Sequence, residues 1–249
     1  MIKNSVFSMT TGAMQIHSGD LESHLRDALA RLEHINQPAI VIDPFFQDSG
    51  FLKCIVDCLT EVSRGLPETV VIAPAEPTLG SIAAVRDELA KISPDAVIAL
   101  GGGSAIDTAK IARMSLSNEN ALAALSGPNI NMKPHPSTFF AIPSTAGTGS
   151  EVTEVAVASS EDGNYKLPFR SQHIAASIVL LDPSVGYAAP SSIRAASGYD
   201  ALTHAVEAYV SRLANPITDA LSLSALRILA KHLPKACGME PDLDCFHRC

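Results

Sequence analysis

Short apolar runs alternate with amphipathic stretches over the first part of the chain. Each run is bounded by polar or turn residues, as are the buried strands of parallel sheets. The stretches between the runs repeat apolar residues every three or four positions, as helices do. This alternation predicts a parallel β-sheet covered on both faces by helices. Strands are expected at Pro38–Asp43, Thr69–Ile72, Asp95–Leu100 and Phe139–Ile142, and helices at 21–32, 50–63, 79–92 and 104–114.

Three further stretches have strand character. Ser5–Gln15 is polar and apolar by turns and is expected to form an edge strand or a hairpin. Val155–Ser159 and Ile178–Leu181 are expected to be strands, and Glu161–Asn164 is expected to form a turn between them because it is rich in turn-forming residues. These segments complete the predicted α/β part of the chain.

The pattern becomes helical throughout from Ser191 to Leu233, shortly after Asp182-Pro183. We therefore expect two domains, an α/β domain at residues 1–185 and a helical domain at residues 186–249. The last helix of this stretch is expected to be well buried because leucines recur along it. These leucines are Leu221, Leu223, Leu226, Leu229 and Leu233.

Composition excludes several classes of protein. A hydrophobic share of 47% with 18% charged residues is typical of a globular chain. A net charge of −8 argues against a nucleic-acid partner, because phosphate binding needs clustered Lys and Arg. No apolar run approaches the roughly 18–20 residues that span a membrane, and no secretory leader is evident, so a cytoplasmic protein is expected. Five scattered cysteines do not form a disulfide framework, which agrees with a reducing compartment.

Asp43 directly follows the first predicted buried strand. Ligands of open α/β sheets bind beyond the carboxyl ends of the strands. A carboxylate at that place accepts hydrogen bonds from the ribose hydroxyls of adenosine and repels a 2′-phosphate. A turn residue before Pro44 explains the same aspartate equally well, so both interpretations stay open.

Gly101-Gly102-Gly103-Ser104 joins a predicted strand to a predicted helix. Glycines let the backbone approach a phosphate closely, and the free amides at a helix start attract its charge. The spacing is neither Gly-x-Gly-x-x-Gly nor a Walker loop. We expect a phosphate-binding turn, and the alternative is a glycine turn that only permits tight packing. Asp107 and Lys110, on the following helix, are expected to be solvated or paired rather than catalytic.

Pro143–Thr153 is a loop of hydroxyl-bearing residues and glycines directly after an apolar strand. Such a loop offers many hydrogen-bond donors without bulk, as wrapping a diphosphate or a nicotinamide carboxamide requires. A flexible surface loop is more often charged, so a binding role is favoured.

Asp200 and His204 lie four residues apart in Gly198–Glu207, a stretch that we interpret as the opening of a helix. Residues i and i+4 share one face of a helix. A carboxylate oxygen and an imidazole nitrogen side by side suit a divalent transition metal. Taken alone the signal is weak, because an aspartate near a helix start is favoured by the helix dipole whatever its neighbour.

Together these motifs resemble the iron-containing (group III) alcohol dehydrogenase family. The resemblance covers residues 5 to 240 and is specific because four segments occur in order at fitting distances. It implies a nucleotide-binding α/β domain with a parallel sheet, followed by the start of an all-helical domain, with the site between them. This is the dehydroquinate synthase-like fold. The segments are Gly101–Ser104 with Asp107, Pro143–Glu151, Asp182-Pro183 and Gly198–Glu207.

The resemblance implies roles for individual residues in binding NAD. Asp43 would bind the adenosine ribose and favour NAD over NADP, and Lys166 would reach the ribose or phosphate from the strand beyond the turn. The pyrophosphate would be held by Gly102, Gly103 and Ser104, and Asp107 belongs to the same motif. The nicotinamide half would be lined by Ser144, Thr145, Thr153 and Val155.

The resemblance also implies a metal centre and a reaction. Asp200 and His204 would be two ligands of Fe²⁺ or Zn²⁺, which acts as a Lewis acid on the substrate oxygen during hydride transfer between an alcohol or aldehyde and NAD(H). The family completes this metal site with two histidines further along the helical domain. Cys249 is the last residue of this chain, so we expect a C-terminally truncated member of the family. The resemblance further implies a homodimer.

Two positions depart from the family pattern, and two histidines invite comparison with the expected metal ligands. Ala176 replaces a usual proline, with an effect expected only in a loop, and Glu76 replaces a common asparagine near the cofactor edge, where its charge is expected to weaken binding. His232 is expected to lie near a helix end, and His247 has a single residue between it and each of Cys245 and Cys249, which is not the ligand arrangement of a structural zinc site. Neither histidine is expected to substitute for a metal ligand.

Three functions remain open at this stage. The favoured one is a metal-dependent oxidoreductase using NAD and an alcohol or aldehyde. The second is a dinucleotide-binding remnant without turnover, because two metal ligands are missing. The third is a lyase on the related dehydroquinate synthase-like fold, disfavoured because Gly198–Ala205 has the dehydrogenase form.

Overall fold

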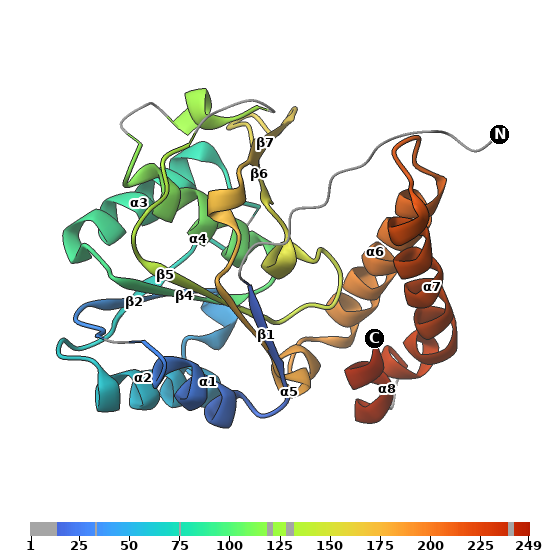
Figure 1. Ribbon diagram of the computed structural model, residues 1–249, viewed down its shortest axis with the longest axis horizontal. Helices are drawn as coiled ribbons and strands as arrows, with labels where there is room; N and C mark the ends of the chain where they lie inside the picture. The colour runs from blue at the N-terminus through green and yellow to red at the C-terminus, as the bar shows by residue number, and fades with distance from the viewer. Residues whose placement is uncertain (1–13, 33, 75, 119–121, 128–131, 239–241) are drawn as a thin grey trace.

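The computed structural model describes residues 14–32, 34–74, 76–118, 122–127, 132–238 and 242–249, and only the backbone of residues 123, 125 and 247. A six-stranded parallel sheet with the order β1-β8-β5-β4-β2-β3 lies at its centre (Figure 1). The strands are β1 (Gln15–Ser18), β2 (Pro38–Ile42), β3 (Glu68–Val71), β4 (Ala96–Gly101), β5 (Thr138–Pro143) and β8 (Ile178–Leu181). The parallel α/β fold is as the sequence predicts.

Helices cover both faces of the sheet, α1 and α2 on one side and α3 and α4 on the other (Figure 1). Every residue of β2 and β4 is buried, because neighbouring side chains point alternately into the two layers of core. Three of these four helices begin where a polar side chain caps them, as when Asp20 accepts a 2.9 Å hydrogen bond from the Ser23 amide. Their bounds are α1 (Leu21–Leu29), α2 (Gly50–Val62), α3 (Leu79–Ile92) and α4 (Gly103–Ser115).

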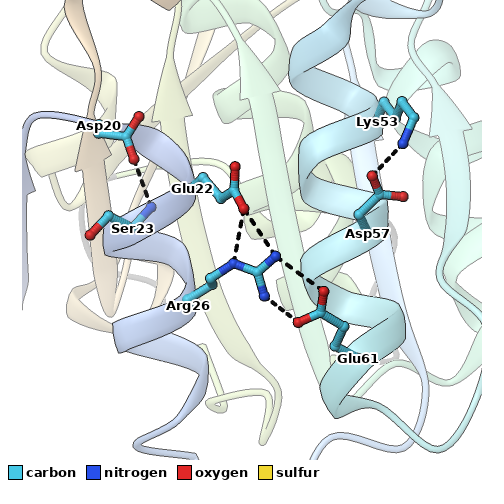
Figure 2. A network of polar contacts seen from close by, with 7 residues as sticks. All are labelled: Asp20, Glu22, Ser23, Arg26, Lys53, Asp57 and Glu61. Carbon is cyan, nitrogen blue, oxygen red and sulfur yellow. Dashed lines mark hydrogen bonds and ion pairs between the residues drawn. The ribbon is translucent and has the colours of Figure 1, made fainter.

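A charged network joins α1 to α2 on the outer surface (Figure 2). Arg26 donates to Glu22 on its own helix at 3.0 and 3.1 Å and to Glu61 at the end of α2. Glu22 and Glu61 are more than half exposed, so solvent screens these ion pairs and the network contributes little to stability. The buried leucines beneath it hold the two helices together.

The turn at Glu161–Asn164 connects different strands from those expected. It joins β6 (Val155–Ser159) to β7 (Lys166–Arg170) in a separate antiparallel pair, and the chain reaches β8 only afterwards. Pro168 interrupts the apolar pattern of β7, and an edge strand tolerates a proline. The expected strand at Ser5–Gln15 lies mostly outside the described residues.

The helical part follows α5 (Pro183–Tyr187) and consists of α6 (Ser191–Val210), α7 (Pro216–Ala236) and α8 (Leu243–Arg248). Gly198 lies in the middle of α6, so the interpretation of this stretch as a helix opening is wrong. Leu233 of α7 packs against Gly198 so closely that a Cβ there would lie 2.3 Å from its Cδ1. Glycine at this position therefore permits the two helices to touch.

The expected burial of α7 is also wrong. Leu229 is 4% exposed, whereas Leu221 is 67% and Leu223 is 37% exposed. Leucines at 221, 223, 226 and 229 cannot share one face of a helix, since residues i and i+2 point in different directions. One stripe of α7 packs on α6 and α8, and the rest faces outward.

Candidate functional site

A crevice opens at the carboxyl edge of the sheet between β2 and β4. The two strands are neighbours, but the helices that follow them, α2 and α4, lie on opposite faces of the sheet. Chains that diverge in this way leave a space above the strand ends where ligands bind. Asp43 follows β2 there, and its amide donates a 3.0 Å hydrogen bond to Leu100 of β4.

The glycine turn after β4 forms the floor of this crevice. Gly101 has a φ of +151°, and Gly102 caps α4 without any side-chain hydrogen bond to the first helical turn. A Cβ on Gly103 would lie 2.8 Å from Thr148, so no larger residue fits. The start of α4 therefore presents backbone amides and a positive helix end to a bare surface, which suits a phosphate group.

One cavity of about 850 Å³ extends from this turn to α6. Eleven of the twelve residues predicted as cofactor or metal ligands line it. The exception is Ser144, which is buried outside the cavity and donates its amide to the Gly101 carbonyl at 2.9 Å. The lining residues are Asp43, Gly102, Gly103, Ser104, Asp107, Thr145, Thr153, Val155, Lys166, Asp200 and His204.

Several residues that line the cavity were not predicted individually from the sequence. Thr148 and Ser150 lie in the hydroxyl-rich loop, which the sequence singles out as a whole but not residue by residue. Ser159 is the last residue of β6, and Ser197 lies one turn before Asp200 on α6. The sequence spacing of these serines does not predict their place, because strand pairing and helix packing bring their hydroxyls to the cavity.

Asp107 and Lys110 contact the loop rather than solvent. Asp107 accepts hydrogen bonds from the Ser150 hydroxyl and, at 2.9 Å, from the Val157 amide. Burial raises the pKa of Asp107, and the Ser150 hydroxyl, Lys110 and the Val157 amide oppose that shift. Lys110 is fully buried and hydrogen-bonded, so of the two expected environments, solvated or paired, the solvated one is wrong.

Glu76 is not a free charge at the cavity edge. Its carboxylate pairs with the Lys166 ammonium and accepts a 2.9 Å hydrogen bond from the Ser159 hydroxyl. These contacts, led by the one to Lys166, lower the pKa of Glu76. All three residues line the cavity, so Glu76 holds Lys166, the residue expected to reach the cofactor.

Asp200 and His204 face each other on α6, with Asp200 Oδ1 3.7 Å from His204 Nε2. Two ligands bound to one metal at about 2.0–2.2 Å lie roughly 3.4 Å apart at a tetrahedral angle, so the pair nearly has ligand spacing. His204 Nδ1 lies 3.3 Å from the Gly147 carbonyl oxygen, which can only accept a hydrogen bond, so Nδ1 carries the proton. This contact leaves the Nε2 lone pair directed at the place where a metal would sit.

The described residues bring together two candidate metal ligands, Asp200 and His204, without a third beside them. No group of three or more His, Cys, Asp or Glu side chains that fits a metal occurs in this part of the chain. His232 lies on α7 with Nδ1 3.4 Å from Cys245 Sγ, away from Asp200 and His204. The side chain of His247 lies outside the described residues. Within the described part of the chain, the Asp200–His204 pair is therefore an incomplete candidate metal site.

The sheet order, the glycine turn at the strand ends and the crevice above them define a doubly wound nucleotide-binding type of α/β fold. Comparison with known families is more specific. The chain belongs to the iron-containing alcohol dehydrogenase family, whose model matches residues 14–183. The model for the C-terminal part of Fe-containing alcohol dehydrogenases matches residues 194–245.

Individual relatives agree with this assignment. Sulfoacetaldehyde reductase of Bilophila wadsworthia is 36% identical over 200 residues, covering 79% of this chain and 50% of its own length. Alcohol dehydrogenase 4 of Schizosaccharomyces pombe is 38% identical over 197 residues, covering 79% and 46%. The chain thus spans about half the length of the curated relatives it matches. The family match favours the dehydrogenase fold over the lyase alternative.

Solved structures show the same fold. Sulfoacetaldehyde reductase from Bifidobacterium kashiwanohense, crystallised with NAD⁺, superposes with a TM-score of 0.86 at 26% identity, covering 98% of this chain and 64% of that one. The alcohol dehydrogenase from Oenococcus oeni gives 0.86 at 28%, covering 98% and 63%. Among the described helices, none has the length and apolarity to cross a membrane.

Gly147 couples the hydroxyl loop to α6 and provides a test of this packing. A Cβ at Gly147 would lie 2.6 Å from the Ser197 carbonyl oxygen, closer than real contacts allow. Gly147→Ala is expected to reduce the free energy of unfolding by about 1–3 kcal/mol, because overpacking forces the backbone to move. Urea unfolding followed by circular dichroism measures the change.

The matched control is Gly50→Ala, at the first residue of α2. Nothing lies within 4 Å of an added Cβ there, and alanine favours a helix by up to about 1 kcal/mol. Equal stability of the two variants would show that close packing of Gly147 against α6 does not contribute to stability.

Proposed function

We propose that this chain supplies the NAD-binding half and two metal ligands of a metal-dependent oxidoreductase. The reaction is hydride transfer between NAD(H) and a small alcohol or aldehyde. The observation that carries the proposal is that one cavity contains both the glycine turn and the Asp200–His204 pair. One extended ligand in that space would bring its phosphates to α4 and its reactive end to α6.

Each group of cavity residues is proposed to bind the part of the ligand that suits its chemistry. The α4 amides at Gly102–Ser104 would bind the pyrophosphate, and the Asp43 carboxylate would accept from the adenosine ribose hydroxyls. The hydroxyls of Thr145 and Thr153 would orient the nicotinamide without bulk. Asp200 and His204 would hold Fe²⁺ or Zn²⁺, since both metals accept oxygen and nitrogen ligands.

A bound metal would supply Lewis acidity to the substrate oxygen. The chain's own contribution is to fix the two ligands on one helix face and to orient His204 through Gly147. Small substrates are proposed because relatives carry names such as NAD-dependent methanol dehydrogenase and sulfoacetaldehyde reductase. A homodimer is proposed from the family resemblance alone, and a cytoplasmic location from the composition of the chain.

A dinucleotide-binding module without turnover is the second candidate. It is favoured by one observation: within the described residues the metal pair has no third ligand. The phosphate and ribose contacts do not depend on that pair. The two candidates therefore share NADH binding and differ in metal-dependent turnover.

The metal pair separates these candidates. Purified protein supplied with Fe²⁺ or Zn²⁺ is expected to reduce small aldehydes with NADH, followed by the loss of nicotinamide absorbance. Asp200→Asn and His204→Ala are each expected to lower this rate by about 10-fold or more, because metal ligands are lost. His232→Ala, on α7 outside the cavity, is the control and is expected to keep the rate. NADH binding with no metal-dependent rate would favour the module.

Asp43 provides a test of the cofactor assignment. The chain has no tryptophan, so nicotinamide fluorescence reports NADH and NADPH binding directly. Wild-type protein is expected to bind NADH at least about tenfold more tightly than NADPH, because like charges at Asp43 and the 2′-phosphate repel. Asp43→Ser is expected to close most of that gap.

Serine is chosen because Asp43 also accepts a 2.9 Å hydrogen bond from the Phe45 amide, and serine caps in the same way. Asp48→Ser, an exposed acid outside the cavity, is the control. An unchanged preference in Asp43→Ser would remove Asp43 from the ribose site, and absence of NADH binding by the wild type would contradict the proposed function itself.

Glu76→Gln tests whether the Glu76–Lys166 pair competes with the cofactor. The variant releases Lys166 and removes one negative charge from the cavity, so NADH is expected to bind about three- to fivefold more tightly. The gain is small because both partners are more than half exposed. It is expected to shrink at high salt, since screening weakens exposed charges.

Glu68→Gln, an exposed acid of β3 outside the cavity, is the matched control. The same substitution in a Lys166→Met background is expected to lose most of its effect. A full effect in that background would mean that Glu76 acts on the cofactor without Lys166.

A further inference from the structure

Lys110 is a fully buried cation in the helix that carries the glycine turn. It lies on α4 one turn beyond Asp107, with no exposed surface. Its ammonium donates to the Thr153 and Val155 carbonyl oxygens, each at 2.9 Å, and to the Ser150 carbonyl. Three donors thus meet three backbone acceptors, which satisfies the ammonium group.

The acceptors belong to the short segment that lines the cavity. Ser150, Thr153 and Val155 all face the cavity. The segment is irregular up to residue 154, with a single turn of 3₁₀ helix at Ser150–Val152, and β6 begins at Val155. An irregular segment has few backbone hydrogen bonds of its own. Side-chain donors from α4 therefore fix its shape.

Asp107 completes the attachment from the same helix face. Residues i and i+3 lie together on a helix, and Asp107 accepts from the Ser150 hydroxyl and the Val157 amide. The segment 150–157 is thus held by an acceptor and a donor three residues apart. Both its carbonyls and its donors are tied to the helix that begins at the phosphate-binding turn.

A buried ammonium group is costly, so its presence requires compensation. Burial lowers the pKa of Lys110 to about 8, and the nearby carboxylates Asp107 and Glu151 oppose that shift. An apolar residue of similar length would avoid the desolvation cost and leave three carbonyls unpaired. The three hydrogen bonds thus offset the desolvation cost of the lysine and define the backbone of the segment.

We propose that Lys110 is a positioning residue of the cofactor site, which holds the Ser150–Val155 backbone so that Thr153 and Val155 face the nicotinamide half of NAD(H). The proposal rests on the proposed NAD-binding function. It assigns to Lys110 no contact with cofactor or substrate. Its effect passes through the segment alone.

Arg113 offers a matched comparison on the same helix. It is also buried, at 4% exposure, and donates to the carbonyls of Ser137 and His173 at 3.0 and 2.8 Å. Neither acceptor lines the cavity. Lys110 and Arg113 are thus two buried cations that tie backbone carbonyls to α4, and only Lys110 ties the cavity segment.

The test compares Lys110→Met with Arg113→Met. Both variants are expected to unfold at lower urea concentration. Lys110→Met is also expected to weaken NADH binding about tenfold, as loss of a supporting group typically does, whereas Arg113→Met changes it less than about twofold. A Lys110→Met affinity equal to that of Arg113→Met would overturn the proposal.

Ser150→Ala provides a milder variant that keeps the lysine. It removes the hydroxyl that joins Asp107 to the segment, and it is expected to weaken NADH binding about threefold. Hydrogen exchange of amides 150–157 in the ligand-free protein is a second measure. It is expected to speed up at least about tenfold in Ser150→Ala relative to amides of β4. Unchanged exchange together with unchanged affinity in Lys110→Gln, whose side chain is shorter and uncharged, would overturn the proposal even if Lys110→Met did not fold.

The pH dependence adds a readout that a merely structural lysine would not give. The titratable groups that act on Lys110 are Asp107 on α4 and Glu151 at the loop. Raising the pH through about 8 neutralises the folded lysine first, so the unfolded state binds more protons and stability rises. NADH binding is expected to weaken over the same range, and this fall is expected to be absent in Lys110→Met. A fall that persists in Lys110→Met would belong to another group.

These arms separate the two proposals. Wild-type protein that fails to bind NADH contradicts the proposed function. In that case the exchange of amides 150–157 in the ligand-free protein still decides whether α4 holds the segment.

Discussion

The left-handed turn at Gly101 is the constraint on which the site depends. With a φ of +151°, a Cβ at Gly101 would lie 2.7 Å from Ala105 and 2.9 Å from the Asp43 side chain. Only glycine avoids both contacts. The turn therefore lets α4 start directly beside the end of β2, which brings the bare helix terminus and the Asp43 carboxylate to one crevice. The sheet core beneath fixes both strands, so this geometry does not depend on a ligand.

Local patterns predicted the sheet and most of the site because those features are encoded in short segments. Continuous apolar runs gave β2 and β4 with ends within about one residue of the structure. The i, i+4 spacing of Asp200 and His204 places both on one helix face wherever the helix starts. The error in the start of α6 therefore did not affect the pair. The family resemblance supplied the roles, which spacing alone could not assign.

Features that arise from packing between distant segments could not be predicted in the same way. Lys110 is buried because the Ser150–Val155 backbone folds over it, and nothing in the sequence of α4 distinguishes it from a surface lysine. Lys166 meets Glu76 across 90 positions of the chain. Ser144 lies next to cavity residues in sequence but points away, because successive residues leaving a strand face opposite sides. Each error follows from tertiary contacts that local periodicity does not record.

The two halves of the cavity are joined mechanically at the hydroxyl loop. Its first part approaches α6 at Gly147, whose carbonyl orients His204, and its last part is tied to α4 through Lys110 and Asp107. A shift of this loop would therefore move the proposed nicotinamide contacts and the proposed metal ligand together. The proposed hydride transfer would depend on the distance between the substrate carbon and the nicotinamide ring, and misplacement by about 1 Å can cost 100-fold in rate. A rigid loop held at both ends meets that requirement, which gives a physical reason for burying a cation beneath it.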